Sequence, residues 1–317
     1  MLNTVRIGLF VLLVAVAIPG YTAEAACPPA TEKPTPEMVQ AAVHNARDHG
    51  FLWRITKDGR TSFLYGTIHV ATLDWMFPGP RVTQAIRATD TMALELDMLD
   101  ADIQARMNKG MAALHSMALP EPLMKRIRQQ AESECVPYAS LANAPPELQI
   151  AMLVIMVGRW EGLDVSYAID IVLAEIGHRA KKNMVSLETP EFLLQMMLMK
   201  TPGETMAYVK DSLDELETGR SRSLLKRLSK SWTNADYDEM ENFKEWCECL
   251  NTVNEREVMR RMIDERSSPL ADKIDALHGS GKRVFAAVGS LHMFGPMGLP
   301  TLMANRGYQV ERIDLKQ

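Results

Sequence analysis

An apolar segment that runs into Gly-x-x-His occurs twice in this chain. The first copy is Gly66-Thr67-Ile68-His69 and the second is Gly289-Ser290-Leu291-His292. A glycine at the exit of a strand lets the backbone turn sharply and approach a bound group, and a histidine three residues later supplies an imidazole there. A single histidine after a strand is usually a hydrogen-bonded structural residue. Two copies in one sheet indicate a shared site, because α/β proteins usually place their sites at one strand edge.

Two glutamates also stand at the ends of segments that read as strands, namely Glu95 and Glu188. Each could add a carboxylate ligand to a metal or act as a base on water. The ordinary alternative is a helix cap or a surface ion pair, and we prefer that alternative for Asp97 and Asp170. We therefore predict three catalytic residues, which are His69, His292 and Glu95. The predicted metal ligands are the same three residues together with Glu188.

The elements that must position these residues can be read from hydrophobic patterns. Segments with apolar or alternating patterns typical of strands lie at 51–55, 62–65, 91–97, 184–187, 283–288 and 308–313. Helical periodicity dominates most of residues 101–277. Strands therefore lie near both ends of the chain. These patterns predict an α/β fold, with a central mixed β-sheet formed by N- and C-terminal segments and a large helical insertion or cap.

The N-terminus has the three parts of a secretory signal peptide. Arg6 precedes the apolar run Ile7–Ile18, and Ala23-Glu24-Ala25 supplies the small-x-small pattern of a cleavage site. The apolar run is too short to span a bilayer. A lipoprotein would begin at Cys27, but Glu24 stands where that pattern normally has an aliphatic residue. We therefore expect residues 1–26 to be removed and the protein to be exported, either periplasmic or secreted, rather than anchored at Cys27.

The rest of the chain is expected to hold a leader and first helix at 27–50 and one domain at 51–313, with its helical lobe at roughly 101–277. No later segment offers the long uncharged stretch of a membrane helix, which predicts no stable membrane insertion after signal cleavage. The formal net charge is −5 and basic residues are interspersed with acidic ones. The sequence therefore has no cluster of basic residues of the kind that binds nucleic acid, and we exclude nucleic acid as a partner.

Four cysteines remain after the expected cleavage, and an oxidising compartment would permit disulfides among them. They are Cys27, Cys135, Cys247 and Cys249. Four cysteines allow three connectivities, so the pairing stays open. Cys247-Glu248-Cys249 could also be a thiolate metal pair, but no second Cys/His pair stands nearby to complete a zinc site. We prefer a disulfide or free thiols there.

An ordered set of motifs between residues 51 and 313 resembles the TraB/GumN family. The set comprises Leu52-Trp53-Arg54 through His69, Leu94-Glu95-Leu96-Asp97, Gly162-Leu163-Asp164, Ala168-Ile169-Asp170, Leu187-Glu188-Thr189, Val288 through His292 with Gly295 and Gly298-Leu299, and Arg306 through Ile313. That family is related to the TIKI metalloproteases, in which two Gly-x-x-His motifs and a glutamate mark a Mn- or Co-dependent peptidase site. Where many relatives have Arg-Asn, this chain has Arg266-Ser267.

The resemblance implies an exported metal-dependent hydrolase, a peptidase in which a metal-activated water attacks a peptide or protein substrate. It implicates His69, His292 and Glu95, with Glu188 as a further candidate and Arg266 as a substrate-binding residue. The implied cofactor is Mn²⁺ or Co²⁺, and the ligand types would also accept Zn²⁺. The alternative is a non-catalytic protein that uses the same pocket to bind a peptide, a metal or a haem-like ligand. A purely structural protein would leave the repeated motif unexplained.

Overall fold

The computed structural model describes residues 27–29, 33–114 and 117–316. Within them, six strands form one mixed sheet in the order β4-β3-β5-β2-β1-β6. The strands are β1 (Phe51–Lys57), β2 (Arg60–Thr67), β3 (Thr91–Leu94), β4 (Asn183–Ser186), β5 (Val284–Gly289) and β6 (Gln309–Ile313). β1 and β2 form an antiparallel hairpin that turns at Asp58 and Gly59, both with positive φ.

Four neighbouring strands of this sheet run parallel to one another. β2 pairs in parallel with β5, β5 with β3, and β3 with β4. β1 is antiparallel to both β2 and β6. The carboxyl ends of β2, β5, β3 and β4 therefore lie at one edge of the sheet, where open α/β sheets place their ligands.

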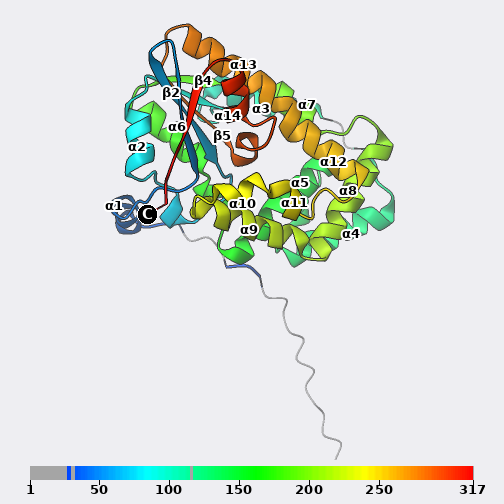
Figure 1. The fold of residues 1–317 in the computed structure, drawn as a ribbon. Helices are drawn as coiled ribbons and strands as arrows, with labels where there is room; N and C mark the ends of the chain where they lie inside the picture. The colour runs from blue at the N-terminus through cyan, green and yellow to red at the C-terminus, as the bar shows by residue number, and fades with distance from the viewer. Residues whose placement is uncertain (1–26, 30–32, 115–116, 317) are drawn as a thin grey trace, which may run out of the picture.

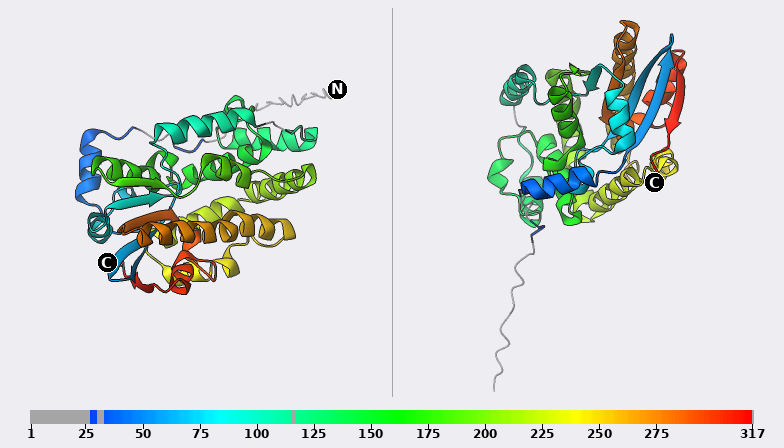
Figure 2. Two further views of the ribbon diagram at one scale, coloured as in Figure 1. Left: turned by 90° about the horizontal axis from the view of Figure 1, so that it is seen from above. Right: turned by 90° about the vertical axis from the view of Figure 1, so that its left-hand side faces the viewer.

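Helices cover the sheet and form a second region beside it (Figure 1). They are α1 (Pro36–His44), α2 (Pro80–Arg87), α3 (Ala101–Ala113), α4 (Glu121–Ser133), α5 (Pro146–Met156), α6 (Ile169–Arg179), α7 (Pro190–Met197), α8 (Pro202–Glu217), α9 (Arg220–Thr233), α10 (Tyr237–Glu241), α11 (Phe243–Trp246), α12 (Val253–Met259), α13 (Glu265–Gly279) and α14 (Leu299–Asn305). A π-helical turn, Arg260–Asp264, joins α12 to α13. Figures 1 and 2 show that this α12–α13 run crosses from the helical region to the sheet.

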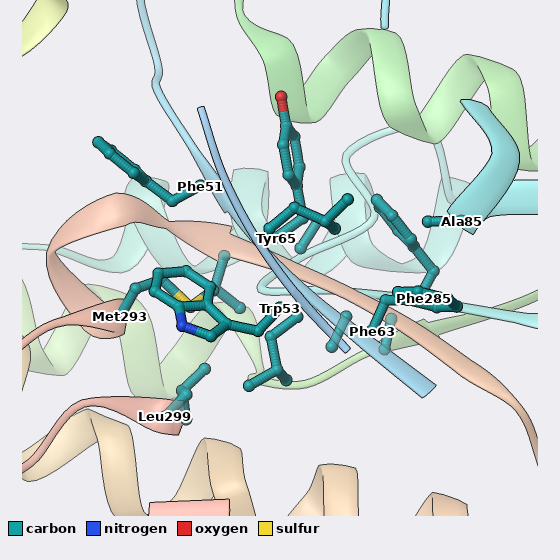
Figure 3. Packing of buried hydrophobic residues seen from close by; sticks show 14 of the residues in the cluster. Phe51, Trp53, Phe63, Tyr65, Ala85, Phe285, Met293 and Leu299 are labelled. Atoms are coloured by element: carbon teal, nitrogen blue, oxygen red, sulfur yellow. The ribbon is translucent and has the colours of Figure 1, made fainter. Parts of the chain in front are cut away.

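Two hydrophobic cores correspond to these two regions. The larger core surrounds the sheet, and Figure 3 shows Phe51, Trp53, Tyr65 and Phe285 filling it around β1, β2 and β5. The smaller core lies among helices α4, α5 and α8, and it includes the fully buried Ile127. Each region buries its apolar side chains in its own core. Neither core therefore has to fill the boundary between the two regions, and a pocket can form there.

The predicted fold class is confirmed, with two differences in detail. β3 ends at Leu94, so Glu95 follows the strand and Asp97 lies beyond it. β4 comes from the middle of the chain and interrupts the helical segment. Its residues pair with β3 in parallel, in agreement with the strand pattern at 184–187.

No helix in the described part of the chain combines the length and apolarity needed to cross a membrane. The expected signal peptide at 1–26 lies outside the described residues. Export, the cleavage site and the proposed domain limits therefore stay predictions.

The cysteines form two disulfides, Cys27–Cys135 and Cys247–Cys249. This pairing agrees with our preference for a disulfide over a thiolate metal pair at Cys247-Glu248-Cys249. The two bridges differ greatly in the chain they close, with sequence separations of 108 and 2 residues.

Removing the long-range bridge should weaken the fold. In the chain-entropy model, a disulfide stabilises more when it closes a longer loop. The double variant Cys27→Ser/Cys135→Ser is expected to lose about 2–4 kcal/mol of unfolding free energy, measured by urea denaturation. The matched variant Cys247→Ser/Cys249→Ser should lose clearly less. Equal losses would mean that loop length does not govern these two bridges.

Candidate active site

All four predicted site residues follow the carboxyl ends of the four parallel strands. His69 comes two residues after β2, and His292 comes three residues after β5. Glu95 follows β3 directly, and Glu188 comes two residues after β4. The register places Thr67 opposite Gly289, so the two Gly-x-x-His motifs leave the sheet side by side.

Gly289 marks the point where three of these side chains converge. A methyl group built on its α-carbon would lie 3.3 Å from Glu95 Oε1, 3.7 Å from His69 Nε2 and 3.9 Å from His292 Cδ2. The absence of a side chain at this position thus leaves the space that the three groups face. The shared-site prediction was that both imidazoles lie in one pocket near Glu95, and the structure has this arrangement.

The pocket is a cavity of about 330 Å³ between the sheet edge and the helices. Its polar end carries His69, Glu95, Arg266 and His292. Apolar side chains from both regions line the rest, namely Phe51, Ile68, Val70, Val154, Ile155, Leu225, Leu228, Trp232, Met240, Met262, Ile263 and Leu291. Such a cavity can hold an apolar group while its polar end acts on an adjoining bond.

Arg266 on α13 joins the two glutamates. Its Nη2 donates to Glu95 Oε2 at 2.6 Å and to Glu188 Oε2 at 2.6 Å, and its Nε donates to Glu188 Oε1 at 2.8 Å. The side chains of Arg266 and Glu188 are only 6% and 4% exposed. Glu188 therefore has both oxygens on Arg266 and does not line the pocket, although we predicted it as a metal ligand.

Glu95 is held as an anion. Its Oε1 accepts from the amide of Gly289 at 2.6 Å, and its Oε2 accepts from Arg266. Burial opposes this charged form, but the charges of His292, Arg266 and His69 together with the Gly289 hydrogen bond lower the pKa of Glu95 to about 2. The carboxylate is therefore fixed in position and weakly basic.

His292 is buried and neutral. Burial, together with the nearby Arg266 charge, lowers its pKa to about 4, and Glu95 opposes this only in part. Ser267 Oγ donates to the carbonyl of Ile263 at 2.9 Å, so it accepts from His292 Nδ1, 3.0 Å away. This chain of hydrogen bonds fixes the tautomer and leaves a lone pair on His292 Nε2.

His69 differs in its surroundings, because its side chain is 58% exposed. Burial of the ring disfavours its charged form, but the hydrogen bond and charge of Asp170, together with the charge of Glu95, raise the pKa of His69 to about 9. Since much of the side chain meets solvent, the upward direction rests on Asp170, whose Oδ1 lies 3.3 Å from Nδ1. The pocket thus faces one protonated and one neutral imidazole.

Three groups at this site were not predicted from the sequence. Asp170 orients His69, although we preferred a cap or surface role for it. Ser267 orients His292, and the amide of Gly289 binds Glu95. Asp97 also lies outside the pocket lining, but it is neither a helix cap nor a surface residue: its side chain is 4% exposed and its Oδ2 lies 2.7 Å from His178 Nε2.

Two imidazoles and a carboxylate are donor types that suit Mn²⁺, Co²⁺ or Zn²⁺. Their arrangement does not suit such an ion: in the described ranges of the chain, no group of three or more His, Cys, Asp or Glu side chains is placed to hold a metal. The engagement of Glu95 by Arg266 and Gly289 is one physical reason. Metal binding here would require Glu95 to be shared with these partners or released from them.

Filling the convergence point should disable the site without unfolding the protein. In Gly289→Ala, the new methyl group would occupy the space between Glu95, His69 and His292. The φ of −51° at this position suits alanine, so we expect little change in melting temperature. Ligand binding or turnover at the pocket should fall about 100-fold.

The matched control is Gly279→Ala at the end of α13, where an added methyl group meets nothing within 4 Å. This variant should resemble the unmodified protein in every assay. If Gly289→Ala binds ligand and turns over substrate as well as Gly279→Ala does, the space beside Gly289 takes no part in binding or in the reaction.

A second cavity of about 260 Å³ adjoins the first and shares Met262, Ile263 and Leu291 with it. Its acidic lining residues are Asp211, Glu215 and Glu255. Burial and the nearby Glu255 carboxylate raise the pKa of Glu215 to about 7. Glu215 therefore titrates near neutrality.

Glu215→Gln should change the pH dependence of stability. Glu215 keeps its proton in the folded chain up to about pH 7, whereas the unfolded chain releases it near 4.5. Stability is therefore lost as pH rises from about 4.5 to 7, and the penalty is complete above 7. Glu215→Gln removes this penalty, so its melting temperature should exceed that of the unmodified protein by roughly 2 °C above pH 7. Below pH 4 the two should agree, and an equal difference at both pH values would contradict the shift.

The fold and site together define an α/β protein with a mostly apolar pocket at the carboxyl edge of its parallel strands, with a cluster of ionisable side chains at one end and helices covering it. A model of the TraB/PrgY/gumN family matches residues 51–312, which is most of the chain. The chain belongs to the TraB/PrgY/gumN family. No curated protein and no solved structure matches it.

Proposed function

We propose that this chain is an exported hydrolase that cleaves a peptide or protein substrate at the pocket of His69, Glu95 and His292. The observation that carries the proposal is the convergence of these three side chains within 4 Å of one point beside Gly289. Their proton states complement one another, since His292 is neutral and His69 is protonated at neutral pH. Two titratable groups with pKa values pushed apart are the usual sign of an acid and base pair.

The pocket itself suits a peptide with an apolar side chain. Its walls are mostly apolar, so burying such a side chain would contribute about 25 cal/mol per Å² of covered surface. Thr67 lines this pocket, only 2% of the residue is exposed, and its buried Oγ1 has no hydrogen-bond partner among the described residues. Buried polar atoms normally have partners, so an amide of the bound substrate would complete the hydrogen bonding of Thr67.

In this proposal the residues divide the proton transfers between them. The lone pair on His292 Nε2 accepts a proton from the attacking water, with Ser267 holding the ring in place. His69, oriented by Asp170, donates its proton to the departing amine. Glu95 is too weakly basic to serve as the base, and its negative charge favours the protonated form of His69.

A divalent ion stays part of the proposal as an activator. With Glu95 released from Arg266 and His69 deprotonated, these two residues and His292 would hold the ion, which would supply a Lewis acid for the substrate carbonyl. Mn²⁺ or Co²⁺ is the choice if the expected relationship to the TIKI metalloproteases holds, and Zn²⁺ suits the same donors. Arg266 would then act on Glu95 rather than on the substrate, which differs from the substrate-binding role we first expected.

The test is a digest of a peptide library by the purified mature protein, with chelator or with added Mn²⁺, Co²⁺ or Zn²⁺. Mass spectrometry should find new peptide termini next to apolar residues. Cleavage in chelator would support the acid and base pair alone, and cleavage only with an ion would support the metal-assisted form. An uncut library under every condition would contradict the proposal.

The engagement of both glutamates by Arg266 favours a second candidate, a non-catalytic exported protein that binds a peptide, a metal or a haem-like ligand. Such a protein would show a ligand-dependent rise in melting temperature without turnover. The same library measures both properties, so it separates binding from hydrolysis.

A further inference from the structure

The Cys247–Cys249 disulfide has features that a purely structural bridge does not need. It follows α11 directly and encloses only Glu248, whose φ of 51° lies in the left-handed region. A non-glycine residue is uncommon there because its Cβ crowds the backbone. A bridge over so short a loop restricts the unfolded chain far less than one over a long loop. The pair therefore contributes little to stability, and opening it releases Glu248.

The two sulfur atoms of this bridge are not equivalent. Cys247 is buried, at 5% exposure, and its Sγ accepts from the amide of Cys249 at 3.2 Å. Cys249 is partly exposed and lines the second cavity. An amide that donates to sulfur favours the thiolate form, because it stabilises the negative charge. Cys247 is thus suited to leave as a thiolate, and Cys249 is the sulfur that an incoming group can reach.

We propose that Cys247 and Cys249 form a thiol–disulfide exchange centre that opens into the second cavity. The co-reactant is a cysteinyl peptide. Its thiolate attacks Cys249 Sγ, the Cys247–Cys249 bond breaks, and Cys247 leaves with the electron pair as a thiolate. A second peptide thiolate then attacks the peptide sulfur of the mixed disulfide and releases Cys249 as a thiolate. Two peptide thiols are oxidised to one peptide disulfide, while one protein disulfide is reduced to two thiols.

The lining of the second cavity indicates which peptides fit. It combines apolar surface from Val258, Met259 and Ile263 with the carboxyl groups of Asp211 and Glu255. None of the described residues that line it is a lysine or an arginine. A peptide whose cysteine is flanked by positive charge should therefore enter more readily than one flanked by negative charge.

The first experiment uses the unmodified mature protein, with Cys27–Cys135 as the internal control. The protein is equilibrated with graded ratios of reduced to oxidised dithiothreitol, then alkylated and analysed by peptide mass spectrometry. Cys247–Cys249 should become half reduced at a ratio roughly tenfold or more below that needed for Cys27–Cys135. If the two disulfides become half reduced at the same dithiothreitol ratio, the proposal is overturned.

The second experiment assigns the attacked sulfur. In Cys247→Ser, the remaining Cys249 should form a mixed disulfide with an oxidised lysine-flanked cysteinyl peptide. In Cys249→Ser, the buried Cys247 should stay unmodified over the same time. The reverse pattern, or modification of both variants at one rate, would contradict the assigned roles. The first experiment needs neither variant, so it decides the proposal even if one variant fails to fold.

The third measurement tests the peptide class. At low ionic strength, a lysine-flanked cysteinyl peptide should reduce Cys247–Cys249 about threefold or more faster than a glutamate-flanked one, and added salt should shrink the difference. Equal rates at low salt would contradict the role of Asp211 and Glu255. None of these results depends on hydrolysis at the first pocket, so failure of either proposal can be told from failure of the other.

Discussion

His69→Ala should abolish turnover and leave the protein folded. Its side chain is 58% exposed and its Nδ1 is hydrogen-bonded to Asp170, so its loss removes little buried contact. General acid catalysis typically contributes 100-fold or more, and we expect a loss of at least about 100-fold in kcat/KM. The measurement is the rate of cleavage of a library peptide, together with the melting temperature.

His292→Ala should remove turnover to a similar extent but also lower stability. Its imidazole is buried, and its removal leaves Ser267 Oγ without the hydrogen bond it accepts. An unpaired buried polar group costs about 1–3 kcal/mol. Because the two histidines act in one reaction, the double variant should lose about as much activity as either single variant.

The control for these histidine variants is His178→Ala. His178 is bonded to Asp97 outside the pocket and should be dispensable for turnover. If this control loses activity as His69→Ala does, the loss comes from general damage to the fold. If His69→Ala and His292→Ala both keep full activity, the shared site is not the reaction centre.

The largest change in stability is expected for Arg266→Met. This substitution leaves Glu95 and Glu188 without their shared cation in a site where Arg266 and Glu188 are only 6% and 4% exposed. Breaking a buried ion pair by removing one partner costs about 3–5 kcal/mol. Urea denaturation should detect a loss of that size, and adding Glu188→Gln should restore part of it by removing one uncompensated charge.

The matched control for Arg266→Met is Arg54→Met, whose ion pair with Glu311 has side chains 47% and 61% exposed. Exposed pairs typically contribute about 0–1 kcal/mol, so this control should lose little stability. Similar losses for the two variants would show that the buried Arg266 network is not an important source of stability.

The sheet and the meeting of the two motifs could be predicted because they rest on local patterns. Each Gly-x-x-His motif follows an apolar strand, and parallel strands end at one edge. The same reasoning placed Glu95 beside both imidazoles. The same reasoning placed Glu188 at this edge but did not predict its partner, because a position after a strand does not determine which neighbour binds the side chain. In the structure both carboxylate oxygens of Glu188 accept hydrogen bonds from Arg266.

The orienting groups could not be read from the sequence. Asp170 lies in the first turn of α6 and Ser267 lies in α13, so each reaches its histidine from a separate helix, 101 and 25 residues away in the chain. An aspartate in the first turn of a helix also has an ordinary explanation as a stabiliser of the helix dipole. The pairing of the cysteines could not be predicted from the sequence either, since it depends on which loops approach one another.

The central claim is that the pocket of His69, Glu95 and His292 hydrolyses an amide bond. Its most direct test is mass spectrometry of a peptide library incubated in heavy-oxygen water with the purified mature protein and each candidate ion. We predict product peptides whose new carboxyl groups carry one heavy oxygen with the unmodified protein, and none with His69→Ala. Labelled products at the same level from both proteins, or no labelled product from either, would contradict the claim.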